Sequence, residues 1–303
     1  MRALVTGGAG FIGSNLVDKL IEDNHEVIIV DNMSTGKKDN INPKAEFWGY
    51  DIADVDENWD EVFKGVDIVF HTAAKARVQP SIDNPVEFDR TNVGGIVNML
   101  DCSKKYGVTR FIYSSSSSVY GNVEQTPTPE SHKLSPLSPY ALQKLIGEQY
   151  CKLFSELYGL ETVCLRYFNV YGERQLLEGA YCLVMGIFAR QKLSGEPMTI
   201  RGDGEQRRDF TYVGDVVDAN IRCATNLGVE FNGEVFNIGN GDNRSVNQIA
   251  DMIGGDKVNV EPVIEPRETL ADNSKAKRVL GWETTVKIED WMKNYKEDMG
   301  LWK

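Results

Sequence analysis

Residues 1–13 read MRALVTGGAGFIG, and this stretch decides the fold. An apolar run of strand length leads into Gly7, Gly10 and Gly13, and apolar residues then recur at helical spacing. A strand, a glycine turn and a helix in this order can hold a dinucleotide pyrophosphate. The glycines let the backbone approach the phosphates, and the first turn of the helix offers free N–H groups. The stretch therefore predicts dinucleotide binding, and the alternative is a glycine-rich loop without a ligand.

A second apolar run, residues 27–30, ends in Asp31, at about the 20-residue distance expected of a carboxylate that binds the adenosine ribose. Strand-like runs and helical patterns continue to alternate through the first half of the chain. This alternation predicts an α/β fold with a Rossmann-type, doubly wound parallel sheet. Helices are expected on both faces of the sheet, and ligands beyond the carboxyl ends of its strands.

Two further strand ends fit a dinucleotide. Asp51 and Ile52 follow a strand-like run at the place where an adenine edge would lie. Ala73 and Ala74 follow the apolar strand 66–71, and side chains this small let a cofactor backbone come close. We therefore expect all four residues in the cofactor pocket.

The alternation stops after Phe168, which indicates a second domain. The dinucleotide-binding domain is predicted to comprise residues 1–168 together with 209–240. The intervening residues 169–208 and the final residues 241–303 have shorter periodic segments and more glycine, proline and charge. They are predicted to form a smaller, interleaved α/β domain that binds the substrate.

The composition limits the possible functions. The chain has 303 residues, of which 41% are hydrophobic and 26% are charged, as in ordinary globular proteins. A net charge of −12 disfavours a nucleic-acid groove, which needs a basic surface. The sequence contains no apolar stretch long enough to span a bilayer and begins directly with a strand, so we expect a cytoplasmic protein without a membrane partner. Five scattered cysteines predict reduced thiols, and three unclustered histidines predict no bound metal.

Tyr140 and Lys144 lie four residues apart in a helical pattern over residues 140–158, so they share one face. A tyrosine has a reference pKa of about 10, and a neighbouring ammonium and an oxidised nicotinamide would both lower it. Lys144 can also hydrogen-bond the nicotinamide ribose. Such a tyrosine can remove a hydroxyl proton as hydride leaves the adjoining carbon. The alternative is an ordinary surface pair on a helix.

Motifs of one family recur along nearly the whole chain. They are the glycine motif Gly7-x-x-Gly10-x-x-Gly13 and the segments Asp31-Asn32, 71–74, 91–93, 114–121, 140–144, 166–169, 202–210, 215–217 and 271–276. Together they resemble the NAD-dependent epimerase/dehydratase family, the extended short-chain dehydrogenases that act on nucleotide sugars.

The resemblance implies roles for individual residues. The catalytic triad falls on Ser116, Tyr140 and Lys144, with Ser116 donating a hydrogen bond to the oxygen that becomes a ketone. Asp31 without a neighbouring arginine disfavours a 2′-phosphate, so NAD is expected rather than NADP. The residues expected to bind NAD are Gly7, Gly10, Phe11, Ile12, Gly13, Asp31, Asn32, Asp51, Ile52, Ala73, Ala74, Asn92, Ser114, Tyr140, Lys144 and Tyr167. The residues expected to bind the sugar nucleotide are Ser116, Ser118, Asn169, Arg201, Arg208 and Thr269.

The two residues after Ser116 narrow the implied reaction. Both are acidic in the family's 4,6-dehydratases, and the second is usually glutamate in the uronate decarboxylases and cysteine in the GDP-sugar epimerase/reductases. In this chain they are Ser117 and Ser118. Only the Tyr–Lys redox step then remains, as in the 4-epimerases. C4 is oxidised, the 4-keto sugar rotates, and the hydride returns from a retained NAD.

The resemblance therefore implies a UDP-hexose 4-epimerase that interconverts UDP-glucose and UDP-galactose. Thr269 stands where a tyrosine would restrict the pocket, and this small residue indicates room for N-acetylhexosamines. Two alternatives stay open: a UDP-glucuronate 4-epimerase or decarboxylase, and a non-catalytic dinucleotide-binding regulatory protein. Family members commonly dimerise through two long helices, here 85–106 and 140–158, which implies a homodimer.

The chain departs from the family pattern at the second phosphate clamp, an Arg-x-Gly-Glu/Asp segment. Ungapped counting places Pro262 at its arginine and Ile264 at its glycine, and Arg267 is the alternative clamp if the loop is shorter. Arg201 also departs, because an aromatic or aliphatic residue is usual near the uracil. Its guanidinium either stacks on the base or lies in solvent.

Overall fold

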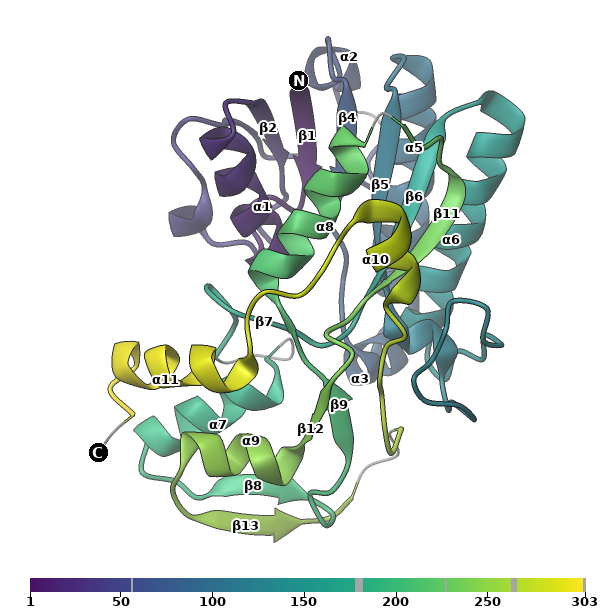
Figure 1. Cartoon of the computed structure of the whole chain (residues 1–303). Coiled ribbons are helices and arrows are strands. Elements are labelled where there is room, and N and C mark those ends of the chain that lie inside the picture. Colours follow the sequence, from purple (N-terminus) through teal and green to yellow (C-terminus); the bar gives the residue numbers. More distant parts are fainter. Residues whose placement is uncertain (56, 178–181, 227, 263–265, 302–303) are drawn as a thin grey trace.

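The computed structural model describes residues 1–55, 57–177, 182–226, 228–262 and 266–301. A seven-stranded sheet lies at its centre, in the order β11-β6-β5-β4-β1-β2-β3 (Figure 1). All six neighbouring pairs are parallel, which confirms the predicted doubly wound α/β fold. The strands are β1 (Arg2–Thr6), β2 (Glu26–Val30), β3 (Glu46–Trp48), β4 (Ile68–His71), β5 (Arg110–Ser116), β6 (Glu161–Tyr167) and β11 (Asn232–Ile238).

Both faces of this sheet are covered by helices, so the side chains of a central strand are buried in both directions. In β1, Ala3 and Val5 belong to the apolar core on one face, and Leu4 belongs to the core on the other. The first core receives the apolar sides of α1 (Phe11–Glu22) and α8 (Val213–Thr225). The second core receives α2 (Trp59–Val62), α5 (Gly95–Lys105) and α6 (Pro139–Tyr158). Figure 1 shows α8 crossing in front of the strands.

The two long helices of the sequence analysis are present with one modification. The helix expected over 85–106 consists of α4 (Pro85–Asp89), a π-helical turn η2 (Arg90–Gly94) and α5. Such turns widen a helix locally and are frequent at functional sites. Helix α6 begins one residue earlier than expected because a proline is tolerated in the first turn. Ser138 caps it by accepting a hydrogen bond from the Ala141 N–H, and Gly159 ends it with φ 69°.

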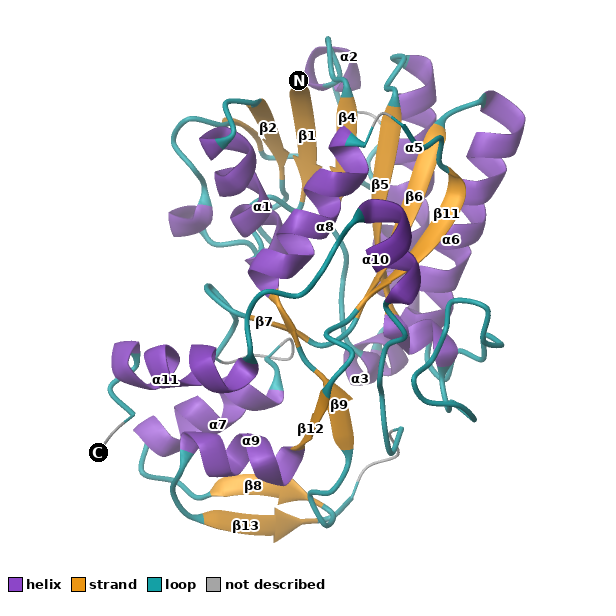
Figure 2. Cartoon of the chain, viewed as in Figure 1, coloured by secondary structure: helices purple, strands orange, loops and turns teal. Residues whose placement is uncertain are grey.

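A smaller layer lies below the large sheet in the view of Figure 2. Its apolar core joins the helices α7 (Val184–Leu193), α9 (Val246–Ile253) and α11 (Ile288–Asp298). Its strands form three short pairs: parallel β7 (Val170–Tyr171) with β10 (Thr211–Tyr212), antiparallel β9 (Arg207–Asp209) with β12 (Asn243–Ser245), and parallel β8 (Met198–Arg201) with β13 (Lys257–Val260). The remaining short helices are η1 (Lys38–Asn40), α3 (Val78–Asp83), η3 (Ser117–Tyr120) and α10 (Ser274–Leu280).

One segment packs differently from the expected division of the chain. Helix α10 lies within the stretch 241–303 that was assigned to the substrate domain, yet its Ala276 and Leu280 belong to the core of the large sheet. Trp282 is fully buried in the same core and donates its indole N–H to the Asp215 carbonyl at 2.8 Å. This seven-residue helix contains too few apolar residues for its sequence pattern to indicate which layer it packs against. The two-domain division otherwise stays a prediction.

Candidate active site

The glycine turn between β1 and α1 is too tightly packed for side chains. Gly7 has φ 71°, and a Cβ built on it would lie 2.8 Å from the backbone of Ala73 at the end of β4. A Cβ built on Gly13 would lie 2.2 Å from the Gly7 carbonyl oxygen. The turn is tied to the neighbouring strand by the Gly7 N–H, which donates to the Val30 carbonyl at 2.7 Å. Glycine at these positions therefore lets the turn, the helix and β4 meet at one point.

A cavity of about 240 Å³ opens beside this turn, at the carboxyl ends of β1, β2 and β4. Ten of the residues predicted to bind the cofactor line it. They are Gly7, Gly10, Phe11, Ile12, Gly13, Asp31, Asn32, Ile52, Ala73 and Ala74. The arrangement fits a dinucleotide, because a bare backbone and a helix N-terminus face the cavity where a pyrophosphate would need hydrogen-bond donors.

Asp31 lines this cavity and connects two of the segments that border it. Its carboxylate accepts hydrogen bonds from the Ala9 N–H at 3.0 Å and from the Met33 N–H at 2.9 Å. Burial raises the pKa of Asp31, whereas these two amide donors lower it. The carboxylate thus joins the glycine turn to the loop after β2, and it borders the cavity at the position expected for a ribose.

Ser116, Tyr140 and Lys144 converge at the end of β5. Ser116 is the last residue of that strand, and its side chain is hydrogen-bonded to Tyr140 in the first turn of α6. Lys144, one turn further along, donates from Nζ to the Ser114 carbonyl at 2.7 Å. Its Nζ lies 5.9 Å from the centre of the Tyr140 ring. The three side chains predicted as a catalytic triad are therefore brought together.

The lowering of the Tyr140 pKa that is expected from Lys144 together with an oxidised nicotinamide stays a prediction. Burial raises the pKa of Tyr140, and it outweighs the hydrogen bond to Ser116 and the charge of Arg77, which both lower it. Burial also lowers the pKa of Lys144 to about 8, against the charge of Glu148.

The other six predicted cofactor residues lie outside the cavity lining: Asp51, Asn92, Ser114, Tyr140, Lys144 and Tyr167. Asn92, in the π-helical turn, donates to the Lys75 carbonyl and accepts from the Lys75 N–H, both at 2.8 Å. The hydroxyls of Ser114 and Tyr167 are hydrogen-bonded to each other at 3.1 Å. Tyr167 also accepts from Asn220 at 2.8 Å, and burial raises its pKa to about 12. Direct contacts of these residues with a cofactor stay predictions.

Asp51, also predicted near the adenine, lies outside the lining as well. Its carboxylate is 3.0 Å from the guanidinium of Arg90. The next residue, Ile52, does line the cavity, so the strand end is in the expected place while the aspartate side chain turns to the arginine.

Two of the predicted sugar-binding residues, Asn169 and Thr269, contact Asp209, which the sequence analysis did not single out. Asn169, at φ 28°, donates to the Asp209 carbonyl at 2.9 Å, and the Thr269 hydroxyl accepts from the Asp209 N–H at 3.2 Å. The Asp209 carboxylate accepts from the backbone N–H groups of Asn240, Gly241 and Ala271 at 2.7–3.0 Å. Burial raises its pKa to about 7. Ser118 has a buried hydroxyl that finds no hydrogen-bond partner within the described part of the chain.

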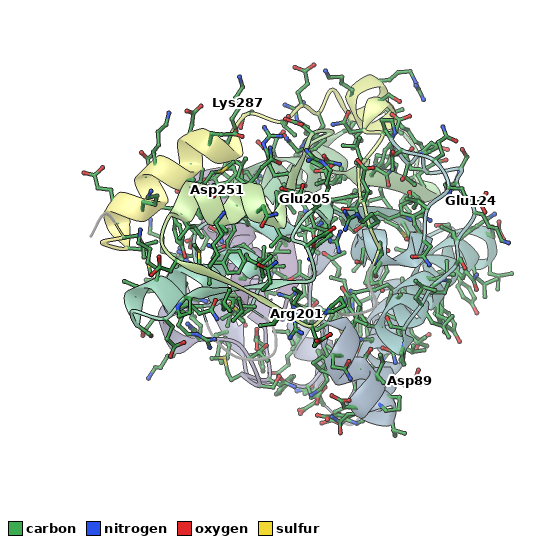
Figure 3. The ribbon with its side chains drawn as sticks, turned by 90° about the horizontal axis from the view of Figure 1, so that it is seen from below. Asp89, Glu124, Arg201, Glu205, Asp251 and Lys287 are labelled. Atoms are coloured by element: carbon green, nitrogen blue, oxygen red, sulfur yellow. The ribbon has the colours of Figure 1, made fainter. Side chains whose placement is uncertain are left out.

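The arginines of the phosphate clamp lie at different depths. Arg208 is half-buried and donates to the Arg207 carbonyl at 2.8 Å. Arg267 is exposed and pairs with both carboxylate oxygens of Asp203 at 2.8 and 2.9 Å, so it is turned to the surface. Arg201, labelled in Figure 3, is an exposed side chain at the end of β8. Pro262 is described, whereas Ile264 lies outside the described residues.

Several lining residues were missed. Lys37 and Asn40 follow β2, and Arg174, Gln175 and Leu176 follow β7. The polar loop after Asp31 was a usable signal for the first two. No local signal marks the others, because tertiary folding alone brings them to the cavity. In the described ranges, no three His, Cys, Asp or Glu side chains are arranged to hold a metal ion, and no helix is long and apolar enough to cross a membrane.

Comparison with known proteins decides the family. The model of the NAD dependent epimerase/dehydratase family matches residues 3–239. UDP-glucose 4-epimerase of Mycolicibacterium smegmatis is 38% identical over 96% of this chain and 96% of its own. The structure of UDP-glucose 4-epimerase from Thermotoga maritima with UDP-glucose superimposes with a TM-score of 0.92, at 42% identity, over 98% of this chain and 99% of that one.

The chain belongs to the NAD-dependent epimerase/dehydratase family. It is accordingly an NAD-dependent enzyme of the epimerase type, as its motifs implied. A further similar structure is UDP-glucuronic acid 4-epimerase from Bacillus cereus with UDP-glucuronic acid and NAD. It has a TM-score of 0.90 and 30% identity, and the match covers 99% of both chains. The family members are thus alike in fold, while their sugars differ.

The close packing of Gly13 predicts a specific loss of NAD. In Gly13→Ala the new Cβ must displace the Gly7 carbonyl, so we expect the NAD content of the purified protein to fall to background. Gly94→Ala is the matched control, because no described atom lies within 4 Å of a Cβ built there. NAD released by denaturation measures both. If Gly13→Ala retained as much NAD as the parent protein, the role of the glycine turn in NAD binding would be contradicted.

Proposed function

We propose that the protein is a UDP-hexose 4-epimerase that interconverts UDP-glucose and UDP-galactose. The observation that carries the proposal is the convergence of Ser116, Tyr140 and Lys144 at the end of β5. This strand pairs with β4, and Ala73 and Ala74, which follow β4, line the dinucleotide cavity. Ser117 and Ser118 follow Ser116 in place of further acids or a thiol. Proton transfer coupled to hydride transfer is then the chemistry that these residues can support. The names of the relatives agree with this reaction.

In this mechanism Tyr140 is the general base and then the general acid. Bound NAD supplies the hydride acceptor at C4 and the donor for the return step. Tyr140 takes the C4 hydroxyl proton and later returns it, and Ser116 donates a hydrogen bond to the same oxygen. Lys144 fixes the end of β5 through the Ser114 carbonyl. The charge of Arg77 favours the phenolate that this role requires.

The activity is tested with UDP-galactose and UDP-N-acetylgalactosamine, without added reductant. We expect interconversion of the first. The small side chain of Thr269 also supports reaction of UDP-N-acetylgalactosamine, and its hydroxyl accepts a hydrogen bond from the Asp209 N–H.

Tyr140→Phe should lower kcat about 10²–10⁴-fold, the usual contribution of a general acid–base group. Tyr158→Phe, on an exposed side chain at the far end of α6, is the control. If neither sugar reacts while NAD is bound, the epimerase assignment to hexoses is wrong. Equal rates of Tyr140→Phe and the parent would favour the non-catalytic alternative.

A second candidate, a UDP-hexuronate 4-epimerase, is favoured by Arg77. This residue stands at φ 95° immediately before α3, in a conformation that non-glycine residues rarely adopt. Helix α3 is tied to the Tyr140 end of α6, because the Tyr140 N–H donates to the Ser81 hydroxyl at 3.1 Å. Burial lowers the pKa of the Arg77 guanidinium, whereas Tyr140 raises it. A partly buried cation beside the catalytic tyrosine suits a carboxylate on the sugar.

The two candidates are separated by Arg77→Ala. If the sugar carries a carboxylate, the kcat/KM of this variant for UDP-glucuronate should fall about 10-fold or more beyond its fall for UDP-glucose, because one charge-assisted hydrogen bond is removed. Loss of the positive charge beside Tyr140 affects both sugars alike. Arg90→Ala, at an exposed arginine that pairs with Asp51 and Asp54, is the control. Equal losses on both sugars would reject Arg77 as a carboxylate contact. Release of carbon dioxide would instead identify a decarboxylase.

We also propose a homodimer built on α6 and its helical neighbours. Leu142, Leu153 and Leu157 are spaced 11 and 4 residues apart, so they lie along one side of α6, and all three are exposed. Val86 of α4, a helix that packs beside α6, is 81% exposed. A second copy of the chain would bury this apolar face as the helices of the family's dimers do. A cytoplasmic location also remains a proposal, supported by five buried free thiols.

The dimer is tested by placing a charge on this face. Leu153→Arg should shift the protein from dimer to monomer, because an unpaired charge would have to be buried at the interface. Leu193→Arg, at an exposed leucine of α7, should leave the mass unchanged. Light scattering coupled to size-exclusion chromatography gives both masses. A monomeric parent protein, or a dimeric Leu153→Arg variant, would count against this interface.

A further inference from the structure

The loop after β7, residues 172–176, lies along the dinucleotide cavity, and we name it the strap. Its residues Arg174, Gln175 and Leu176 line the same cavity as the glycine turn. Arg174 has φ 65°, a left-handed conformation that is uncommon outside glycine. The strap therefore follows a fixed, unusual path at a place where the bound dinucleotide would lie beneath it.

One side of the strap is fastened to α1. The Asn15 amide donates to the Phe11 carbonyl at 2.8 Å and to the Glu173 carbonyl at 3.1 Å, so it joins the helix to the strap. One turn of helix further on, Asp18 forms an ion pair with Arg174. Because α1 starts at the glycine turn, these contacts hold the strap next to the helix N-terminus that faces the cavity.

The other side of the strap is fastened to the small layer through the Glu173 carboxylate. One oxygen accepts from the Tyr212 hydroxyl at 2.9 Å, and the other accepts from the Trp291 indole N–H at 3.0 Å. Trp291 is buried in α11 and stacks on Tyr295, with ring centres 4.5 Å apart and planes 17° apart. The donors are thus rigidly placed, while the carboxylate that accepts from them belongs to the strap.

The positive charge of Arg174 in the strap is complementary to the negative charge of a dinucleotide pyrophosphate. A dinucleotide carries two negative charges on its pyrophosphate, and the Arg174 guanidinium lies at the cavity of a chain whose net charge is −12. A guanidinium offers several planar donors to phosphate oxygens. Its pairing with Asp18 orients it, in the way that supporting hydrogen bonds orient the groups of a preorganised site.

We propose that the strap is a retention clamp for NAD. Arg174 contributes to pyrophosphate binding, and Glu173 is a positioning residue that keeps the strap over the cavity by tying it to α11 and Tyr212. Release of NAD then requires the strap to leave its partners, so these contacts slow dissociation. The clamp rests on NAD binding, and it holds whichever sugar the enzyme uses.

The test measures the exchange of bound NAD for labelled NAD in the purified holoenzyme, without any sugar. Glu173→Ala removes both hydrogen bonds, and Trp291→Phe removes one donor while keeping an aromatic ring. We expect dissociation to be about 10-fold faster or more in Glu173→Ala, with a smaller increase in Trp291→Phe. Arg174→Gln should weaken equilibrium NAD affinity. Glu283→Ala, which removes an exposed carboxylate paired with Lys277 at 3.0 Å, is the matched control and should exchange like the parent.

The unfolding temperature of each NAD-free variant distinguishes clamping from general destabilisation. Unchanged unfolding temperatures together with faster exchange support the clamp. Exchange rates equal to the parent in both Glu173→Ala and Trp291→Phe would overturn it. So would unfolding temperatures that fall in step with NAD loss. These readouts are independent of the proposed reaction, which would fail separately if no UDP-sugar turned over in a fully NAD-loaded parent protein.

Discussion

A buried ion pair between Glu148 and Arg166 holds the active site together. Their closest atoms are 2.7 Å apart, and both side chains are nearly inaccessible to solvent. Two charges in such a place are tolerated only when hydrogen bonds satisfy their remaining atoms. The Ser115 hydroxyl donates to Glu148 at 2.5 Å, and Arg166 donates to the Tyr120 hydroxyl at 2.8 Å. The pair joins α6, which carries Tyr140 and Lys144, to β6, and the hydrogen bond from Ser115 joins the same Glu148 to β5, which carries Ser116.

The same network extends toward the sugar side. The Tyr120 hydroxyl donates to Asn237 at 2.6 Å, and the Asn237 amide donates to the Thr128 carbonyl at 2.9 Å and the Asp272 carbonyl at 3.1 Å. Asp272 lies three residues beyond Thr269. The residues around Ser116 and the loop predicted to bind the sugar are thus parts of one hydrogen-bonded framework. A change of residue in the framework would alter positions at both ends.

Features set by local sequence could be predicted, and features set by burial could not. The glycine turn and α6 follow from spacing and periodicity within short windows, and α6 begins one residue before its expected start. The burial that raises the pKa of Tyr140 could not be predicted, because desolvation depends on the whole surrounding fold. The strap at Arg174 and the acceptor role of Asp209 were missed for a similar reason. Their partners lie far away in the sequence.

The burial of Trp282 has a consequence for how this fold can be divided. The family model ends at residue 239, yet the core beneath the central sheet is completed by a tryptophan 43 positions later. After the large sheet, the chain forms most of the small layer, and it then returns to the core of the large sheet with α10 and Trp282. Helix α11, which follows, belongs to the small layer again. A gene fragment that stops at the family boundary would expose the apolar surface beneath Trp282. The large layer therefore needs the chain as far as Trp282 to bury its core, and it cannot be cut out at the family boundary.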